Sequence, residues 1–164
     1  MDSRKLTRCL FYIYFIVLVW IILFKMQIPF TLVGHGRSIN LVPFAGSVVV
    51  DGRIYVQEIV YNVLIFIPFG VFSGMLGHSK SAVRQLAPSF FTSLALEILQ
   101  FLLAVGATDI TDLLGNTFGG LIGIGIFYLF AKLCREKVYK VLNGIAVAGA
   151  AAMGILFGLL LLAN

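Results

Sequence analysis

Charged residues are scarce in this sequence. Only 12% of its 164 residues are Asp, Glu, Lys or Arg, whereas 60% are hydrophobic, and the mean hydropathy is +1.05. A soluble globular domain has about a quarter charged residues. One domain of this length cannot bury so much apolar surface in a single core, so the composition predicts that the solvent is a lipid bilayer. The net charge of +5 therefore does not indicate a nucleic-acid partner, because basic residues of membrane proteins mark the loops on one side.

Familiar catalytic and metal-binding motifs are also absent. The sequence contains no HExxH, no phosphate-binding Walker loop and no GxSxG, so zinc-protease, nucleotide-hydrolysing and serine-hydrolase activities find no support. It has only two cysteines, Cys9 and Cys134, and two histidines, His35 and His78. Their spacing predicts neither a disulfide framework nor a zinc site. No cofactor is expected from these residues.

Long apolar segments are what the sequence has in abundance. A transmembrane helix needs about 20 apolar residues, with about 17 as a lower bound. The predicted helices cover residues 9–24, extended past Lys25 to residue 30, and residues 59–76, 86–105, 113–131 and 142–163. The basic N-terminus suits a signal sequence, but no small-residue cleavage site follows the first apolar run, which indicates an uncleaved anchor. We expect one all-α domain, residues 1–164, forming a polytopic integral membrane helical bundle with about five transmembrane helices.

Lysine and arginine are distributed unevenly between the predicted loops. The N-terminus and the loops after the second and fourth helices hold nine of the 12 basic residues, namely Arg4, Lys5, Arg8, Lys80, Arg84, Lys132, Arg135, Lys137 and Lys140. The other loops hold Lys25, Arg37 and Arg53. Since basic loops stay in the cytoplasm, the N-terminus is predicted to be cytoplasmic.

Polar side chains recur at the opposite, outer ends of three predicted helices. In ATDITDLLGNTFGG, two aspartates and an asparagine at spacing i, i+3, i+7 share one helix face. The second helix begins with a carboxylate and an amide at spacing i, i+4, and a polar stripe follows the third helix. The predicted outer site, with its preceding loop, consists of Arg37, Asn40, Glu58, Asn62, Glu97, Gln100, Asp109, Asp112 and Asn116.

Each of these residues also has a simpler structural interpretation. Asp109 or Asp112 can cap the fourth helix, because Asp is a preferred N-cap. Asn62 and Gln100 can form hydrogen bonds between helices, worth about 1 kcal/mol each in membranes. Glu97 lies deeper in its helix, so it needs a partner, for which Arg37 is the best local candidate. The oxygen ligands allow a divalent cation such as Mg²⁺ or Ca²⁺, and a network of arginine and carboxylates that locks the loop is the alternative.

Glycines repeat every four residues along the last two predicted helices. Gly115, Gly119 and Gly123 form one such ridge, and Gly154 and Gly158 form another. Ridges of small residues let helix backbones approach each other closely. We expect both ridges to pack within the bundle, and they also allow a homo-oligomer.

Four blocks of sequence resemble, in order, the VanZ-like family of bacterial membrane proteins. They are RSINLVPF, EIVYNVLIFIPFG, SLALEILQ and TDITDLLGNTFGGLIG, within residues 37–124. The helix at 142–163 lies outside the resemblance and is interpreted as an accessory span. The family pattern maps onto Arg37, Asn40, Pro43, Glu58, Asn62, Pro68, Gly70, Glu97, Gln100, Asp109, Asp112, Asn116 and Gly119. One position departs from it, because Ala107 stands where many members have arginine.

The resemblance implies an association with low-level teicoplanin resistance at the bacterial plasma membrane, and it implies no known reaction. Two functions fit. The first is a non-enzymatic protein that alters how the cell envelope meets a glycopeptide antibiotic, by binding a membrane lipid or a lipid-linked cell-wall precursor. The second is an intramembrane enzyme that acts on a phospholipid or polyprenyl phosphate head group, with Asp109 or Asp112 as base or metal ligand. The absence of an obvious pair of nucleophile and base favours the first.

Overall fold

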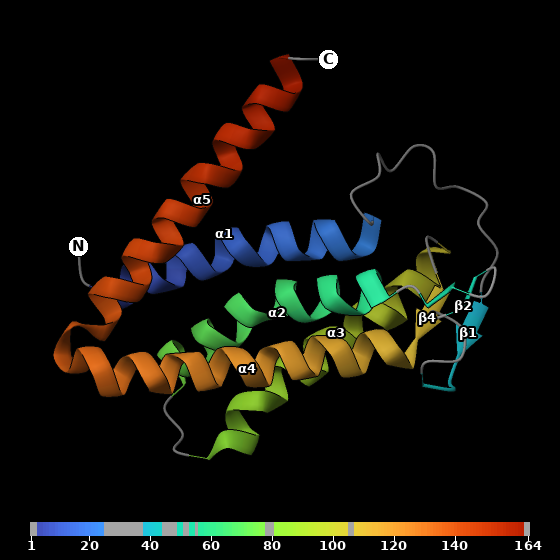
Figure 1. Cartoon of the computed structure of the whole chain (residues 1–164), viewed down its shortest axis with the longest axis horizontal. Coiled ribbons are helices and arrows are strands. Elements are labelled where there is room, and N and C mark those ends of the chain that lie inside the picture. Colours follow the sequence, from blue (N-terminus) through green and yellow to red (C-terminus); the bar gives the residue numbers. More distant parts are fainter. Residues whose placement is uncertain are drawn as a thin grey trace.

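The computed structural model describes residues 3–24, 38–43, 49–50, 53–54, 56–77, 81–104 and 107–162. These residues form long α-helices, with a short 3-10 turn between the last two (Figure 1). The helices are α1 (Ser3–Phe24), α2 (Val56–Leu76), α3 (Ala82–Leu103), α4 (Ile110–Cys134) and α5 (Val138–Leu162), and the turn is η2 (Arg135–Lys137). The predicted all-α membrane bundle is confirmed, and each predicted apolar segment overlaps one of these helices. The predicted residues 25–30, 105 and 163 lie outside the described residues.

The number of membrane spans differs from the prediction. By length and hydropathy, four segments of the described chain qualify rather than five: Ser3–Leu23, Gln57–Leu76, Val83–Leu103 and Ile110–Ile155. The last is long because α4, η2 and α5 follow one another without a break. A straight helix of 46 residues would be about 70 Å long, more than twice the thickness of a hydrocarbon core. The segment instead changes direction at η2, where Arg135 has a φ of 47°, and α5 leads away from α4 (Figure 1).

The bundle has two apolar clusters between its helices. The cluster nearer the C-terminal end of α1 consists of Leu18, Ile22, Leu23, Phe66, Phe69 and Leu96. The cluster nearer its N-terminal end consists of Leu10, Phe72, Met75, Val138 and Leu142. Helix α1 therefore packs on α2 along much of its length, while α5 joins the bundle through its first turns only.

Helices α2 and α4 form the closest pair in the bundle. A Cβ atom placed on Gly119 would overlap the carbonyl oxygen of Val63, and one placed on Gly123 would overlap that of Ile67. Gly115 is less crowded, with the nearest atom, Asn62 Cβ, 3.5 Å from the position of its missing Cβ. The predicted packing ridge on α4 is confirmed, because side chains at its central positions would force the two backbones apart.

The second glycine ridge does not pack within the bundle. No atom lies within 4 Å of the position that a Cβ would occupy on Gly154 or Gly158. The prediction of bundle packing is wrong for these two residues, because α5 diverges from the other helices before it reaches them (Figure 1). The homo-oligomer that such a ridge allows stays a prediction.

Short strands lie at one end of the bundle (Figure 1). Strand β1 (Ser38–Asn40) pairs in parallel with β4 (Ala107–Asp109), so that Asn40 lies opposite Asp109. Strand β2 (Val49–Val50) pairs antiparallel with β3 (Arg53–Ile54). The β1–β4 pair fastens the segment that precedes α2 to the residues that precede α4, and thereby brings two predicted site residues together.

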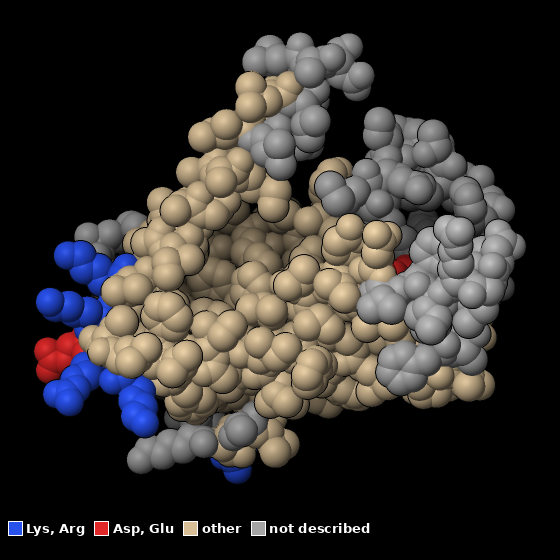
Figure 2. Space-filling model, viewed as in Figure 1, with Lys and Arg blue, Asp and Glu red and all other residues tan. Residues whose placement is uncertain are grey.

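Basic side chains gather at the other end of the molecule, where α1 begins and α4 turns into α5 (Figure 2). The exposed residues of these elements include Arg4, Lys5, Arg8, Lys132, Arg135, Lys137 and Lys140. This end and the strand end are therefore chemically distinct, as the predicted orientation requires. On that orientation the strand end is the outer end of the bundle.

Candidate functional site

The predicted site residues that the structure describes lie mainly at the strand end. Glu97 is 3% exposed, Asp109 and Asp112 are each 7% exposed, and Asn116 is 1% exposed. Arg37 lies outside the described residues. We use the name outer polar cluster for Asn40, Glu58, Asn62, Glu97, Asp109, Asp112 and Asn116. Because burial of carboxylates is costly without hydrogen bonds, the partners of these side chains decide what the cluster can do.

Asp109 is the N-cap of α4. Its backbone is extended, and its Oδ1 accepts a hydrogen bond of 2.7 Å from the backbone N–H of Thr111. Its Oδ2 accepts a second hydrogen bond, of 3.1 Å, from Nδ2 of Asn40. The capping interpretation is therefore confirmed for Asp109, whose carboxylate satisfies an otherwise unpaired N–H in the first turn. The β1–β4 pairing explains why Asn40 is within reach.

Glu97 connects α3 to this cap. Its Oε2 accepts a hydrogen bond of 3.0 Å from the backbone N–H of Asp109, and Oγ1 of Thr108 donates to the backbone oxygen of Glu97 at 3.1 Å. A carboxylate that accepts a backbone N–H forms a strong, charge-assisted bond. Glu97 thus holds β4 against α3 and fixes where α4 begins.

Asp112 faces α2 and does not cap α4. Its Oδ1 accepts a hydrogen bond of 2.6 Å from Nδ2 of Asn62. Asn62 lies one turn after Glu58, which is half-buried in the first turn of α2. Asp112 and Asn62 therefore join the N-terminal parts of α2 and α4, next to the glycine contacts.

Asn116 lies one turn deeper than Asp112 on α4. Its Nδ2 donates a hydrogen bond of 2.9 Å to Oγ of Ser93, which is one turn deeper than Glu97 on α3. Among the described residues no group bonds its Oδ1, which is buried. Exchange of the amide nitrogen and oxygen would leave the nitrogen open instead. In either assignment one end of this carboxamide is available, and an unpaired buried polar group costs about 1–3 kcal/mol.

Gln100 bonds away from the cluster. Its Nε2 donates a hydrogen bond of 2.8 Å to the backbone oxygen of Ile22 on α1. This bond agrees with the interpretation of Gln100 as a link between helices. The other described site residues, apart from Glu58, form the Asn40–Asp109–Glu97 group and the Asn62–Asp112 pair, while Asn116 pairs with Ser93.

The part of the chain that the structure describes contains no group of side chains suited to bind a metal ion. No three or more His, Cys, Asp or Glu side chains there are placed to hold a metal ion. The divalent cation that the sequence allows stays a prediction.

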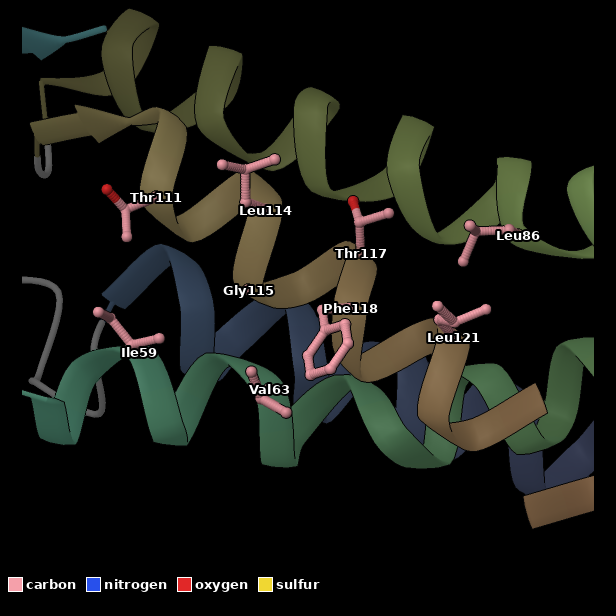
Figure 3. A pocket seen from close by; sticks show the side chains of 9 residues that line it. All are labelled: Ile59, Val63, Leu86, Thr111, Leu114, Gly115, Thr117, Phe118 and Leu121. Carbon is pink, nitrogen blue, oxygen red and sulfur yellow. The ribbon is translucent and has the colours of Figure 1, made fainter. Parts of the chain in front are cut away.

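An apolar groove adjoins the outer polar cluster, and no pattern in the sequence predicts it. It has a volume of about 420 Å³ and is lined from α2, α3 and α4 (Figure 3). Most of its side chains are large and apolar, and Thr111, Gly115 and Thr117 complete the lining. A hydrophobic segment of a membrane helix normally faces lipid or protein, so periodicity alone could not distinguish a groove from a flat surface.

These features define a helical membrane protein with a buried polar cluster at one end and a basic surface at the other. A family model described as VanZ/LLP1 matches residues 11–131. The chain is also 38% identical over 137 residues to Protein VanZ of Enterococcus faecium, covering 82% of this chain and 81% of that protein. The chain belongs to the VanZ/LLP1 family. The match begins within α1, ahead of the first block of resemblance, and ends before α5. No solved structure matches the chain.

Proposed function

We propose that this protein lowers the susceptibility of a bacterial cell to teicoplanin-type glycopeptides, acting from the plasma membrane. We further propose that its outer polar cluster binds the head group of a membrane lipid or of a lipid-linked cell-wall precursor. Membership of the VanZ/LLP1 family and the apolar helices support the first part. The contacts of the cluster support the second.

The open carboxamide of Asn116 is the observation that carries the binding proposal. Asn116 is almost fully buried, yet one end of its side chain has no partner among the residues described. It lies beneath Asp112 on its own helix and pairs with Ser93 beneath Glu97. A polar atom left open at this depth is stabilised when a bound molecule supplies the missing hydrogen bond.

The chemistry of the cluster indicates what kind of head group fits. Carboxylates accept hydrogen bonds only, and the open atom of Asn116 is assigned as an acceptor. A matching ligand donates hydrogen bonds through hydroxyl, amide or ammonium groups. Lipid head groups carry such donors, as do the sugar and peptide of a cell-wall precursor. A protein that binds such a lipid or precursor at the outer face of the membrane changes the membrane surface that a lipophilic glycopeptide contacts.

Alanine substitution of two buried asparagines tests this function. Asn116→Ala removes the open carboxamide, whereas Asn143→Ala removes a buried carboxamide at the other end of the bundle. Asn143 accepts from Oγ1 of Thr7 at 3.0 Å and donates to the backbone oxygen of Ser3 at 2.9 Å. The measurement is the teicoplanin tolerance of a susceptible host that expresses each variant, together with the amount of folded protein in its membrane.

We expect Asn116→Ala to abolish tolerance while the protein stays folded and inserted. Asn143→Ala loses two hydrogen bonds, so it should be less stable, yet it should retain tolerance in proportion to the amount of folded protein. Full tolerance with Asn116→Ala would contradict the binding proposal. Loss of tolerance that follows the amount of folded protein in both variants would assign Asn116 a structural role.

A further inference from the structure

The apolar groove beside the outer polar cluster is shaped for a hydrocarbon chain. Ile59 and Val63 line it from α2, Leu86 from α3, and Leu114, Phe118 and Leu121 from α4 (Figure 3). Its volume is about 420 Å³. An apolar groove at membrane depth has no water to fill it, so hydrocarbon is the occupant that its lining favours.

A glycine and a satisfied hydroxyl keep the groove hollow and apolar. Gly115 has no side chain, and a Cβ at its position would be in ordinary contact with α2, at 3.5 Å from Cβ of Asn62 and 3.7 Å from the backbone oxygen of Ile59, so the glycine keeps this wall free of a side chain. Thr117 also lines the groove, but its Oγ1 donates to the backbone oxygen of Leu113 at 2.7 Å. Thr117 therefore offers no free donor to a ligand in the groove.

The groove begins at the outer polar cluster. Thr111 and Ile59, which line its outer end, are the sequence neighbours of Asp112 and Glu58. Gly115 packs against Asn62, whose side chain is bonded to Asp112. No side chain of the cluster lines the groove, but Asn62 lies against its wall, so a molecule with a polar head near Asn62 and Asp112 can extend from there into the groove.

The length of the groove matches one leaflet of a bilayer. Ten residues of α4 separate Thr111 from Leu121, which corresponds to about 15 Å along the helix axis. This is half of a hydrocarbon core of about 30 Å. A fatty acyl chain extends through one leaflet, whereas a polyprenyl chain is longer than a leaflet, so the groove fits the acyl chain.

We propose that the groove holds one acyl chain of an outer-leaflet phospholipid whose head group lies at the outer polar cluster. This inference rests on the proposed function for the head group, and it selects a membrane lipid over a lipid-linked precursor. The carbonyl end of the chain lies beside Leu114, and its methyl end lies beside Leu121.

Photolabelling in vesicles tests the occupant. The full chain is reconstituted into phosphatidylglycerol vesicles that contain a varied fraction of phosphatidylglycerol with a diazirine near the carbonyl or near the methyl end of one acyl chain. After irradiation, mass spectrometry of peptides locates the labelled residues. The comparison pairs groove residues, which are themselves partly exposed, with exposed residues of α3 outside the groove: Leu114 (47% exposed) with Ile98 (50%), and Leu121 (45%) with Phe91 (64%).

We expect labelling of the groove to saturate as the fraction of probe rises, whereas labelling of Ile98 and Phe91 increases in proportion to it. Gly115→Leu adds a side chain against Ile59 and Val63, the α2 residues that line the groove, so it narrows the groove from that side and should lower labelling at Leu114 severalfold. Gly125→Leu is the matched control, because the missing Cβ of Gly125 has no atom within 4 Å. Thr117→Phe fills the same groove and replaces Gly115→Leu if that variant does not fold.

Two outcomes separate this inference from the proposed function. Unsaturated labelling that is equal at Leu114 and Ile98 would overturn the groove proposal, because the groove would then be ordinary lipid-facing surface. The head-group proposal would still stand if Asn116→Ala abolished tolerance. Saturable labelling of the groove together with full tolerance of Asn116→Ala would overturn the head-group proposal and leave the acyl site in place.

Discussion

The carboxylate of Glu97 accepts a hydrogen bond from the backbone N–H of Asp109, at 3.0 Å, across the gap between the end of α3 and the start of α4. Asp109 in turn caps α4 and bonds Asn40. Two carboxylates of the predicted site therefore also build the architecture of this end. The neighbouring Asp112 bridges to α2 instead. Substitutions chosen among these residues can therefore distinguish the role of a carboxylate charge in binding from its role in the fold.

Substitutions that remove the charge of a carboxylate but keep its size should distinguish its role in binding from its role in folding. Asp112→Asn and Glu97→Gln keep the size and one oxygen acceptor of each side chain. We expect both variants to insert and fold, with stability lowered by about 1 kcal/mol for Glu97→Gln because a neutral acceptor bonds more weakly. Teicoplanin tolerance should be lost in both. Full tolerance in both would show that the charges serve only the fold.

Replacing Gln100 should weaken the bundle without affecting function. Gln100→Leu removes the hydrogen bond to the Ile22 backbone oxygen. Such bonds between membrane helices are worth about 0.6–2 kcal/mol, but leucine also removes the buried Oε1 of Gln100, which has no partner among the described residues, so the melting temperature in detergent should fall by less than the lost bond alone predicts. Tolerance to teicoplanin, normalised to folded protein, should be unchanged. A loss of tolerance at normal folded level would place Gln100 in the functional site.

A large side chain at the contact between α2 and α4 should be highly destabilising. A Cβ on Gly119 already overlaps the Val63 carbonyl oxygen, whereas one on Gly125 meets no atom within 4 Å. Gly119→Leu should therefore reduce membrane accumulation and the melting temperature in detergent strongly, because overpacking forces the helices apart. Gly125→Leu on the same helix should behave like the parent. Equal melting of the two variants would contradict the observed packing.

The orientation in the membrane can be measured with a membrane-impermeant thiol reagent. Both native cysteines are first replaced by serine. In that background, Val42→Cys places a thiol after β1 and Lys137→Cys places one in η2, at two exposed positions. We expect labelling of Val42→Cys in intact cells and of Lys137→Cys only after lysis. The reverse pattern would invert the predicted topology, and the outer polar cluster would then face the cytoplasm.

The sequence predicted the helices because the requirement that the bilayer imposes is local: a run of apolar residues of sufficient length forms a helix in lipid. It predicted the glycine contact on α4 for a similar reason, since small residues at a spacing of four align on one face. The same spacing led to a wrong prediction at Gly154 and Gly158. It shows that the glycines share one face of a helix, but it does not show whether a second helix packs against that face. The angle between α4 and α5, which is set at η2, decides that.

Other features depend on contacts between distant segments. The pairing of Ser38–Asn40 with Ala107–Asp109 joins two short strands that no local pattern distinguishes from loop. Which aspartate caps α4 was likewise open, because Asp109 and Asp112 are both suitable residues near its start. Asp109 donates its backbone N–H to Glu97 and accepts from Asn40, and in that position its Oδ1 accepts the capping bond from the N–H of Thr111.

The glycine contact between α2 and α4 also determines which parts of the molecule can move. Where the backbone of one helix touches that of the other, at Val63 with Gly119 and at Ile67 with Gly123, sliding or rotation brings main-chain atoms into collision. Side chains at an ordinary interface can change rotamer to accommodate such shifts, but backbone atoms cannot. The two helices therefore behave as one stiff unit, and the wall of the groove is preformed. A ligand that enters it does not have to order that wall, which lowers the entropic cost of binding.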